Sequence, residues 1–478
     1  MNNALAKMMV LIGVLACSGV LLWALASPGN GSPVAERAQL IVHEWGTFLS
    51  VQGSDGVTLG GMVDSEEVLP AFVEERGLAS WQRSHIFSKM ETPVTYFYTD
   101  RPRDVQVRVD MPKGILTHWF PNVCQYGPDP SAKGAAAVGG YLDWCSIHLI
   151  PENHPQLREP NSNATFLLKN GHRYSGLIES EDANQVRLVT GAYSVQSIAK
   201  AQIADRRIQK FILPALKPVG QEQTWRFARE TDSALVRKTT YNTKRELEFQ
   251  FEKFLFYRGL GTFLPPLEVR ARQGEKRGLT LSLHNQGAWP LRGVFAIKVH
   301  EQTIQFAALE DLAANATHDV VADSVFVSPV RLDAGVPQAK EAVATALAAA
   351  GLYAKEADAM VNTWEQSYFR TDGLRVLYVL PRVTVDQVIP IQINPAPDGL
   401  VRVMVGRLDV LTPDREQQIE KFVAALSARE PRARAAASAG LARLGRLGEP
   451  ALRRVVASTN DPEVLARARS LLDGLSAK

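Results

Sequence analysis

Residues 90–121 constrain the fold of this 478-residue chain more strongly than any other stretch. Residues 93–98 (PVTYFY) combine β-branched and aromatic side chains, and residues 105–110 (VQVRVD) alternate valine with polar or charged side chains. An alternation with a period of two is typical of a strand with one buried face. The stretch therefore predicts two or three strands of a β-rich body, and it contains no recognisable catalytic motif.

The N-terminus carries one uncharged apolar run, residues 8–26 (MMVLIGVLACSGVLLWALA). It ends in the small-x-small pattern of Ala24-Leu25-Ala26, which fits a signal peptide cleaved after Ala26. Its length also matches the roughly 20 residues that span a bilayer, so an uncleaved membrane anchor fits equally. Lipoprotein processing at Cys17 is a third, weaker alternative. Each alternative predicts an extracytoplasmic body, periplasmic or in the cell envelope, either anchored in the inner membrane or secreted.

Two further cysteines, Cys124 and Cys145, are candidates for one disulfide in such a compartment. It would close a loop of about 20 residues and contribute roughly 3 kcal/mol in the chain-entropy model. The alternative is two separate buried thiols. A metal site made of cysteines alone would need more of them, and no metal or other cofactor is expected. The net charge of +3 gives no sign of a nucleic-acid partner.

The pattern of strands and helices divides the chain. The middle segment has an Asn170-Gly171 hairpin signal between short strands, and one of these strands contains a glycine, which predicts a small β-barrel inserted in the body. The expected parts are a signal or anchor (1–26), a linker (27–37), a β-rich first part (38–158), the inserted barrel (159–215), a β-sandwich second part (216–410) with a helical hairpin (338–366), and a helical tail (411–478). The fold class is α+β, mostly β.

The tail differs from the rest of the chain because it is rich in Ala, Leu and Arg. Three of its four expected helices begin near Pro431, Pro450 and Pro462, and proline is tolerated in the first turn of a helix. The pattern predicts two HEAT-like helical hairpins, too few for a free solenoid, which would dock on the β body. Its slight excess of basic residues could mark a face for a protein partner or for anionic lipid, although a solvated arginine-rich face is the simpler explanation.

Two sets of residues carry a resemblance to known proteins. The strand at 93–98 has the form Pro-Val-x-Tyr-x-Tyr, and Leu347, Gly351, Glu356, Met360 and Trp364 follow in a helix-pair pattern. This combination resembles a group of uncharacterised microbial extracytoplasmic proteins, whose closer members share residues 43–48 (HEWGTF) and 401–407 (VRVMVGR). The resemblance covers about residues 38–410 and implies fold and location, without an activity. The inserted segment resembles small SH3-like or Sm-like barrels of extracytoplasmic proteins.

The strongest candidates for chemistry are His43 and Glu44, with Glu91 as a ligand-binding carboxylate near His43. In a strand, His43 and Glu44 point to opposite faces, which argues against a direct acid–base pair. Trp45 and Trp119 are candidate binding residues at the rim of such a site. Further partners are available, although none has the spacing of a metal motif: Asp64, Glu66, Glu67, His118, His148 and His154.

Two classes of function follow. The first is a non-catalytic envelope protein that binds or scaffolds, and the missing catalytic motifs favour it. The second is an extracytoplasmic hydrolase acting on an envelope polymer, with its site near His43 and Glu91. Convergence of His43, Glu91 and another acidic or histidine side chain in one cleft would favour the hydrolase.

Overall fold

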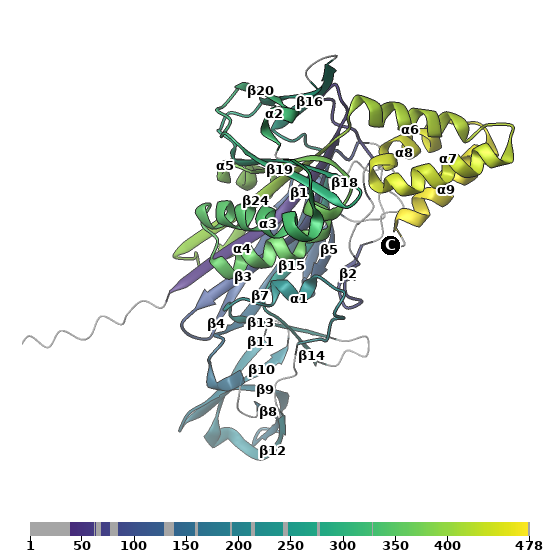
Figure 1. Ribbon diagram of the computed structural model, residues 1–478. Coiled ribbons are helices and arrows are strands. Elements are labelled where there is room, and N and C mark those ends of the chain that lie inside the picture. The colour runs from purple at the N-terminus through teal and green to yellow at the C-terminus, as the bar shows by residue number, and fades with distance from the viewer. Residues whose placement is uncertain are drawn as a thin grey trace, which may run out of the picture. The chain divides into compact units, whose positions relative to one another are not determined.

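The computed structural model describes most of the chain after the linker (Figure 1). The described residues are 39–61, 63, 68–76, 85–128, 138–157, 161–191, 194–211, 216–241, 247–274, 278–326 and 328–476. The expected signal or anchor and the linker lie outside them, as do Asp64, Glu66 and Glu67. Residues 38–478 form one compact unit. In the part of the chain that is described, no helix combines the length and apolarity needed to cross a bilayer.

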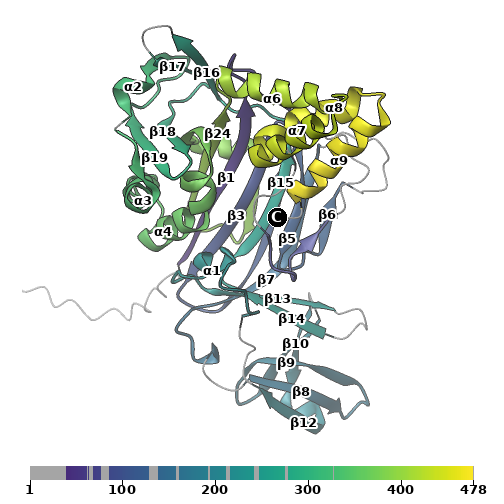
Figure 2. The same cartoon turned by 45° about the vertical axis from the view of Figure 1, so that its right-hand side comes forward.

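The largest sheet contains ten strands among the described residues, and strands from the two ends of the body meet at its centre (Figure 2). In order across the sheet they are β2 (Glu74–Glu75), β5 (Gly114–Phe120), β15 (Leu255–Gly261), β3 (Ser88–Thr99), β1 (Leu40–Gln52), β24 (Gly399–Val410), β22 (Gly373–Val379), β18 (Arg292–His300), β19 (Thr303–Leu309) and β21 (Val330–Arg331). Strand β1 runs parallel to β24 and antiparallel to β3. The stretch at 90–121 forms most of β3 and, with β4 (Arg103–Met111) and β5, makes three strands.

One face of the large sheet packs on two smaller sheets, which makes the body a β-sandwich. Val42 and Phe48 of β1 share a core with Val107 of the second sheet and Leu281 of the third. The second sheet contains β14 (Leu247–Glu252), β13 (Leu235–Tyr241), β7 (Gly140–Ile150), β4 and β23 (Ile391–Asn394), with β6 (Gln125–Gly127) paired to β7. The third contains β16 (Leu267–Gly274), β17 (Gly278–Asn285) and β20 (Thr317–Val321). The alternation of side chains along each strand produces this separation of faces.

The opposite face of the large sheet is covered mainly by helices (Figure 1). Trp45 of β1 shares a core with Val343 of α3 (Leu332–Ala349) and Met360 of α4 (Ala354–Thr363). A π-helix, η3 (Gln366–Arg370), follows α4. The short helix α1 (Trp225–Ala228) packs against α4 in the same core, whereas α2 (Ala322–Val325) and α5 (Arg382–Val388) contribute to the core of the sandwich. The hairpin expected at 338–366 therefore corresponds to α3 and α4, and α3 begins earlier than its apolar pattern indicated.

The inserted segment forms a five-stranded antiparallel sheet with its own core. Its order is β11 (Ser194–Ala199), β10 (Gln185–Gly191), β9 (Arg173–Glu181), β8 (Asn161–Leu168) and β12 (Ile203–Phe211). Phe166, Leu188 and Ile198 are buried in that core. The Asn170-Gly171 turn joins β8 to β9, and Gly171 has a φ of 83°, a conformation that glycine adopts without a steric cost.

The tail consists of four helices: α6 (Pro413–Ala425), α7 (Pro431–Leu444), α8 (Glu449–Ser458) and α9 (Pro462–Ser476), with a short 3₁₀ turn, η4 (Gly445–Gly448), before α8. Leu426, Leu441 and Ala468 belong to their common core. A second apolar cluster joins the tail to the end of β1. In this cluster, Leu49 and Val51 pack with Ile419 and Leu447. The tail is therefore docked on the body, as the small number of repeats predicted.

Cys124 and Cys145 form a disulfide whose Cα atoms lie 6.1 Å apart. It lies at the edge of the second sheet, where the backbone N–H of Cys124 donates to the carbonyl oxygen of Asp143. A disulfide indicates an oxidising environment, as expected outside the cytoplasm.

We predict that the free energy of unfolding of the double variant Cys124→Ser/Cys145→Ser is about 3 kcal/mol lower than that of the wild type. Without the disulfide the loop is no longer closed in the unfolded chain, so the unfolded state gains entropy. Urea denaturation followed by tryptophan fluorescence would measure this difference. A reductant should lower the wild-type stability toward that of the variant and leave the variant unchanged. A wild-type midpoint that is insensitive to reductant would contradict the prediction.

Candidate functional site

His43 is buried against the first turn of α4. Its Nδ1 lies 2.8 Å from Oε2 of Glu356, and only 3% of its side chain is exposed. The same carboxylate accepts hydrogen bonds from the Tyr98 hydroxyl at 2.7 Å and from the Tyr353 backbone N–H at 2.8 Å. The hydrogen bonds among these four groups hold the start of α4 against β1 and β3. His43 of β1, Tyr98 of β3 and Glu356 of α4 therefore meet at one point although they are far apart in the sequence.

Glu44 points to the opposite face of the sheet, as the strand alternation predicted. Its Oε2 pairs with Nε and Nη2 of Arg402 at 2.7 and 2.6 Å. Its Oε1 accepts hydrogen bonds from the hydroxyls of Tyr257 at 2.5 Å and Thr95 at 3.0 Å. Glu44 and Arg402 are both buried, so this carboxylate is a structural ion rather than a group open to a substrate.

Glu91 is buried beside cations on the same face as His43. Its Oε1 lies 2.8 Å from Nζ of Lys89, and both side chains are at most 3% exposed. Burial raises the pKa of Glu91, but Lys89, Arg258 and Arg407 outweigh that effect and hold the pKa below its usual value. Glu91 is therefore ionised and forms a buried ion pair with Lys89 on this face of the sheet.

The structure does not bring the predicted site residues together in one cleft. His43 is opposite Tyr96 on β3, whereas Glu91 is opposite Thr47, four positions further along β1. That separation corresponds to about 13 Å along a strand. Trp45 and Trp119 are both buried, and they belong to the cores on opposite faces of the sheet. The arrangement that would have favoured a hydrolase is not formed by these residues.

Two groups of side chains in the described part of the chain have a spacing suited to a metal ion. One contains Cys124 and Cys145, which are joined in the disulfide. In the other, Nδ1 of His148 lies 3.0 Å from Asp104 and 3.9 Å from Glu179. Arg187 is 2.9 Å and Arg237 is 4.0 Å from Glu179. Because these two cations already neutralise the acidic groups, we assign an ion-pair network that ties the inserted sheet to β4 and β7.

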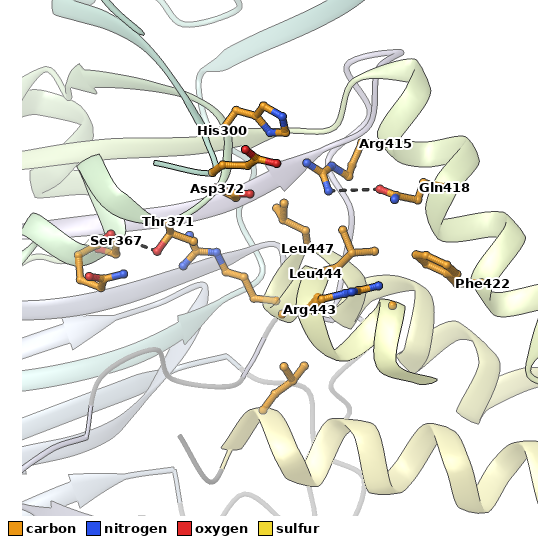
Figure 3. Close-up of a pocket in the computed structure, with 16 residues that line it drawn as sticks. His300, Ser367, Thr371, Asp372, Arg415, Gln418, Phe422, Arg443, Leu444 and Leu447 are labelled. Carbon is orange, nitrogen blue, oxygen red and sulfur yellow. Dashed lines mark hydrogen bonds between the residues drawn. The ribbon is translucent and has the colours of Figure 1, made fainter. Parts of the chain in front are cut away.

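The best candidate for a binding site is a pocket of about 630 Å³ between the body and the tail, here called the body–tail pocket (Figure 3). Its body wall comes from the β18–β19 turn and from η3 with the loop after it, and its tail wall comes from α6, α7, η4 and α9. The volume lies in the range of small-ligand sites. Its charged or titratable lining residues are His300, Glu301, Asp372, Arg415, Arg443 and Arg446.

The two walls of the body–tail pocket carry opposite charges. Glu301 and Asp372 lie on the body wall, and Arg415 and Arg443 on the tail wall. Figure 3 shows Asp372 beside His300 on one side and Arg415 and Arg443 on the other. The Arg415 guanidinium donates to Oε1 of Gln418 at 3.2 Å. Phe422, Leu444 and Leu447 add apolar surface to the lining.

A buried chain of charges lies beneath this pocket and joins its walls. Asp409 of β24 accepts from Nε of Arg375 at 3.2 Å and lies 3.1 Å from Nη2 of Arg446 in η4. Arg375 also donates to the carbonyl oxygens of Ser367 and Tyr368 in η3, at 3.0 and 2.8 Å. Burial lowers the pKa of Arg375 to about 10, so the side chain stays charged at neutral pH.

Further contacts hold the body wall in place. Arg375 donates to the carbonyl oxygens of Thr371 and Asp372, where η3 ends. Glu301 has a φ of 53°, in a two-residue turn between the paired residues His300 and Thr303. Such turns favour glycine at this position, so a glutamate there carries a steric cost. A π-helix and a strained backbone are both features that concentrate at functional sites.

Neither the residues that line this pocket nor the charges beneath it were predicted from the sequence. Arg375 and Asp409 looked like ordinary charged residues within strands, although each occupies an inward-facing position between apolar neighbours. A charged residue at such a position is the signal that could have identified them, because a buried charge needs a partner. Nothing in the sequence indicated that Arg446 would supply part of that partnership.

Asp409 should be essential to the stability of this region. We predict that Asp409→Asn lowers the free energy of unfolding by about 3 kcal/mol or more, because the arginines around it lose their buried counter-charge. Hydrogen exchange should quicken in η3 and η4 together. Asp386→Asn is the matched control, since Asp386 pairs with Arg402 at 2.8 Å but is 43% exposed, and it should cost less than about 1 kcal/mol. Equal losses for both variants would contradict the prediction.

His118 gives a test by pH. Burial, followed by the charges of Arg258 and Lys89, lowers the pKa of His118 to about 3. Between that value and about 6.5 the unfolded chain binds a proton that the folded protein does not bind, so acidification favours unfolding. We predict that wild-type stability falls, through this residue, by up to about 1.4 kcal/mol per pH unit below pH 6.5. Urea denaturation across this range should show a shallower fall for His118→Gln.

The exposed His172 of the inserted sheet provides the control for this measurement. His172→Gln should keep the wild-type dependence of stability on pH. If His118→Gln and His172→Gln give the same slope, burial of His118 does not contribute to acid sensitivity.

Comparisons with known proteins identify no family. No family model matches the chain, and no curated protein matches it. Among solved structures, the chain is similar to the mu-homology domain of yeast delta-COP-I complexed with a WxWxV peptide, with 8% sequence identity. That match covers 78% of this chain and 96% of the other, with a TM-score of 0.23, and at this score it supports no argument about function.

Proposed function

We propose that this protein is a non-catalytic binding protein of an oxidising, extracytoplasmic compartment, and that its ligand occupies the body–tail pocket. Residues 8–26 would export the chain, as a cleaved signal or as an inner-membrane anchor. The observation that carries the proposal is the body–tail pocket itself, which has a volume of about 630 Å³ and is lined by acidic residues of the body and basic residues of the tail. The buried chain Arg375–Asp409–Arg446 joins its walls.

The placement of the candidate catalytic residues supports binding over catalysis. His43, Glu44 and Glu91 are all at most 3% exposed, and each is engaged by a neighbouring side chain. A general acid or base must reach the proton it transfers within hydrogen-bond distance. His43 instead pairs with Glu356 of α4, and Glu44 and Glu91 pair with cations on the strands.

An extracytoplasmic hydrolase with its site near His43 and Glu91 is the second candidate function. One observation favours it: the 2.8 Å contact between His43 and Glu356 has the geometry of a base held by a carboxylate. The burial of His43 and its distance from Glu91 along β1 argue against it. The tail surface outside the pocket is a further proposed site for a protein partner.

A ligand screen would test the binding function. The full chain, in detergent if the N-terminal segment is retained, would be screened by thermal unfolding against a library of polar metabolites, sugars and peptides. We expect at least one compound to raise the Tm of the wild type and to lose this effect in Arg443→Glu, because binding only to the folded state stabilises it. Arg443 is exposed, so the substitution should leave the fold intact.

Two results would count against the proposal. The first is that no compound raises the Tm of the wild type, or that every compound that does so raises the Tm of Arg443→Glu equally. The other is turnover of an envelope polymer that His43→Gln abolishes while the variant keeps its Tm, which would favour the hydrolase.

A further inference from the structure

The charges on the two walls of the body–tail pocket have no ionic partners within the described residues. No ion pair within 4.0 Å is formed there by Glu301, Asp372, Arg415 or Arg443. Glu301, Asp372 and Arg443 are exposed, so their charges are open to a ligand. The contacts of Arg375 fix the body wall, and Arg446 joins the tail wall to Asp409, which holds the two walls in place.

The separated charges restrict the kind of ligand that fits. A ligand that is only anionic would suit Arg415 and Arg443 but would be repelled by Glu301 and Asp372. A ligand that is only cationic would meet the reverse problem. A molecule with an anionic group at one end and a cationic group at the other complements both walls. Its uncharged middle could lie on Phe422 and Leu444, which supply apolar surface in the same pocket.

We propose, resting on the binding function above, that the body–tail pocket binds a short peptide with free termini. Its carboxylate contacts the tail wall at Arg415 and Arg443, and its ammonium group contacts the body wall at Glu301 and Asp372. A free amino acid carries the same two charges. However, it would leave most of the 630 Å³ unfilled.

The backbone of Glu301 supports this assignment independently. Glycine would be the least strained residue at a φ of 53°, yet the chain has a glutamate there, and this residue lines the pocket. A residue that is unfavourable for folding and placed at a pocket is expected where function requires its side chain.

Titration calorimetry with trialanine would test the proposal on the full chain. The arms are trialanine, N-acetyl-trialanine, trialanine amide, the doubly blocked peptide and free alanine. We expect trialanine to bind most tightly and each single block to weaken binding by about tenfold or more, since a charged hydrogen bond is lost. Free alanine should bind more weakly than trialanine.

Variants that keep the fold would locate the binding. Glu301→Gly should retain or raise the wild-type Tm and weaken trialanine binding about tenfold, while leaving the affinity for the N-acetylated peptide unchanged. Arg443→Gln should weaken binding of trialanine but not of its amide. Arg432→Gln, an exposed change elsewhere on α7, is the control and should bind like the wild type.

The proposal is overturned if no alanine peptide binds, if all blocked forms bind as tightly as trialanine, or if Glu301→Gly binds trialanine like the wild type. These failures are separable from failure of the binding function. If another polar compound still raises the Tm and requires Arg443, the pocket binds a ligand of a different class. If no compound does so, the binding function fails as well.

Discussion

The fold depends on the parallel pairing of β1 with β24, which joins the first and last strands of the body. Glu44 and Arg402 are paired across these strands although they are 358 positions apart in the chain. Burying two charges costs several kcal/mol for each ion, and the cost is offset only where the geometry and the remaining hydrogen bonds are good. Here the hydroxyl groups of Tyr257 on β15 and Thr95 on β3 donate the remaining hydrogen bonds to Glu44. The interaction therefore requires four strands in one register, and its main effect is to specify that register.

The same register positions the buried chain Arg375–Asp409–Arg446 on the other face of the sheet. Because side chains alternate along a strand, Arg402 faces the sandwich core and Asp409 faces the helices. Asp409 is opposite Val51 on β1 and Arg375 on β22. A shift of one residue would move Asp409 into the sandwich core and separate it from Arg446 of the tail. The pairing that closes the body therefore also positions the body–tail pocket.

Much of the architecture could be predicted because its signals are local. Alternation at 90–121 identified strands, Asn170-Gly171 identified a hairpin in the inserted sheet, and prolines with alanine-rich repeats identified the helical tail. Alternation also placed His43 and Glu44 on opposite faces. The partners of these two residues, Glu356 and Arg402, could not be predicted, since no local pattern says which distant segment covers a strand.

The site was missed for the same reason. The pocket combines residues near 300, 366–372 and 415–447, and their proximity depends on how the tail docks. His43 and Glu91 attracted attention as functional residues because histidine and glutamate can carry out catalysis. In the structure each is buried and pairs with a neighbouring side chain. Residue type alone could not separate a catalytic group from a structural one, because burial is decided by segments far away in the sequence.

The junction between body and tail combines apolar contacts that stabilise the docking with charged residues that line the body–tail pocket. Apolar contacts of Leu49, Ile419 and Leu447 stabilise the docking, with a further hydrogen bond from the Ser54 backbone N–H to Glu416 at 2.9 Å. Burial of apolar surface contributes most of such a stabilisation. The adjoining surfaces can then keep charges that do not pair with each other, since docking does not depend on them. A pocket with two charged walls can persist next to an apolar contact for this reason, and substitutions among its charged residues should leave the tail docked.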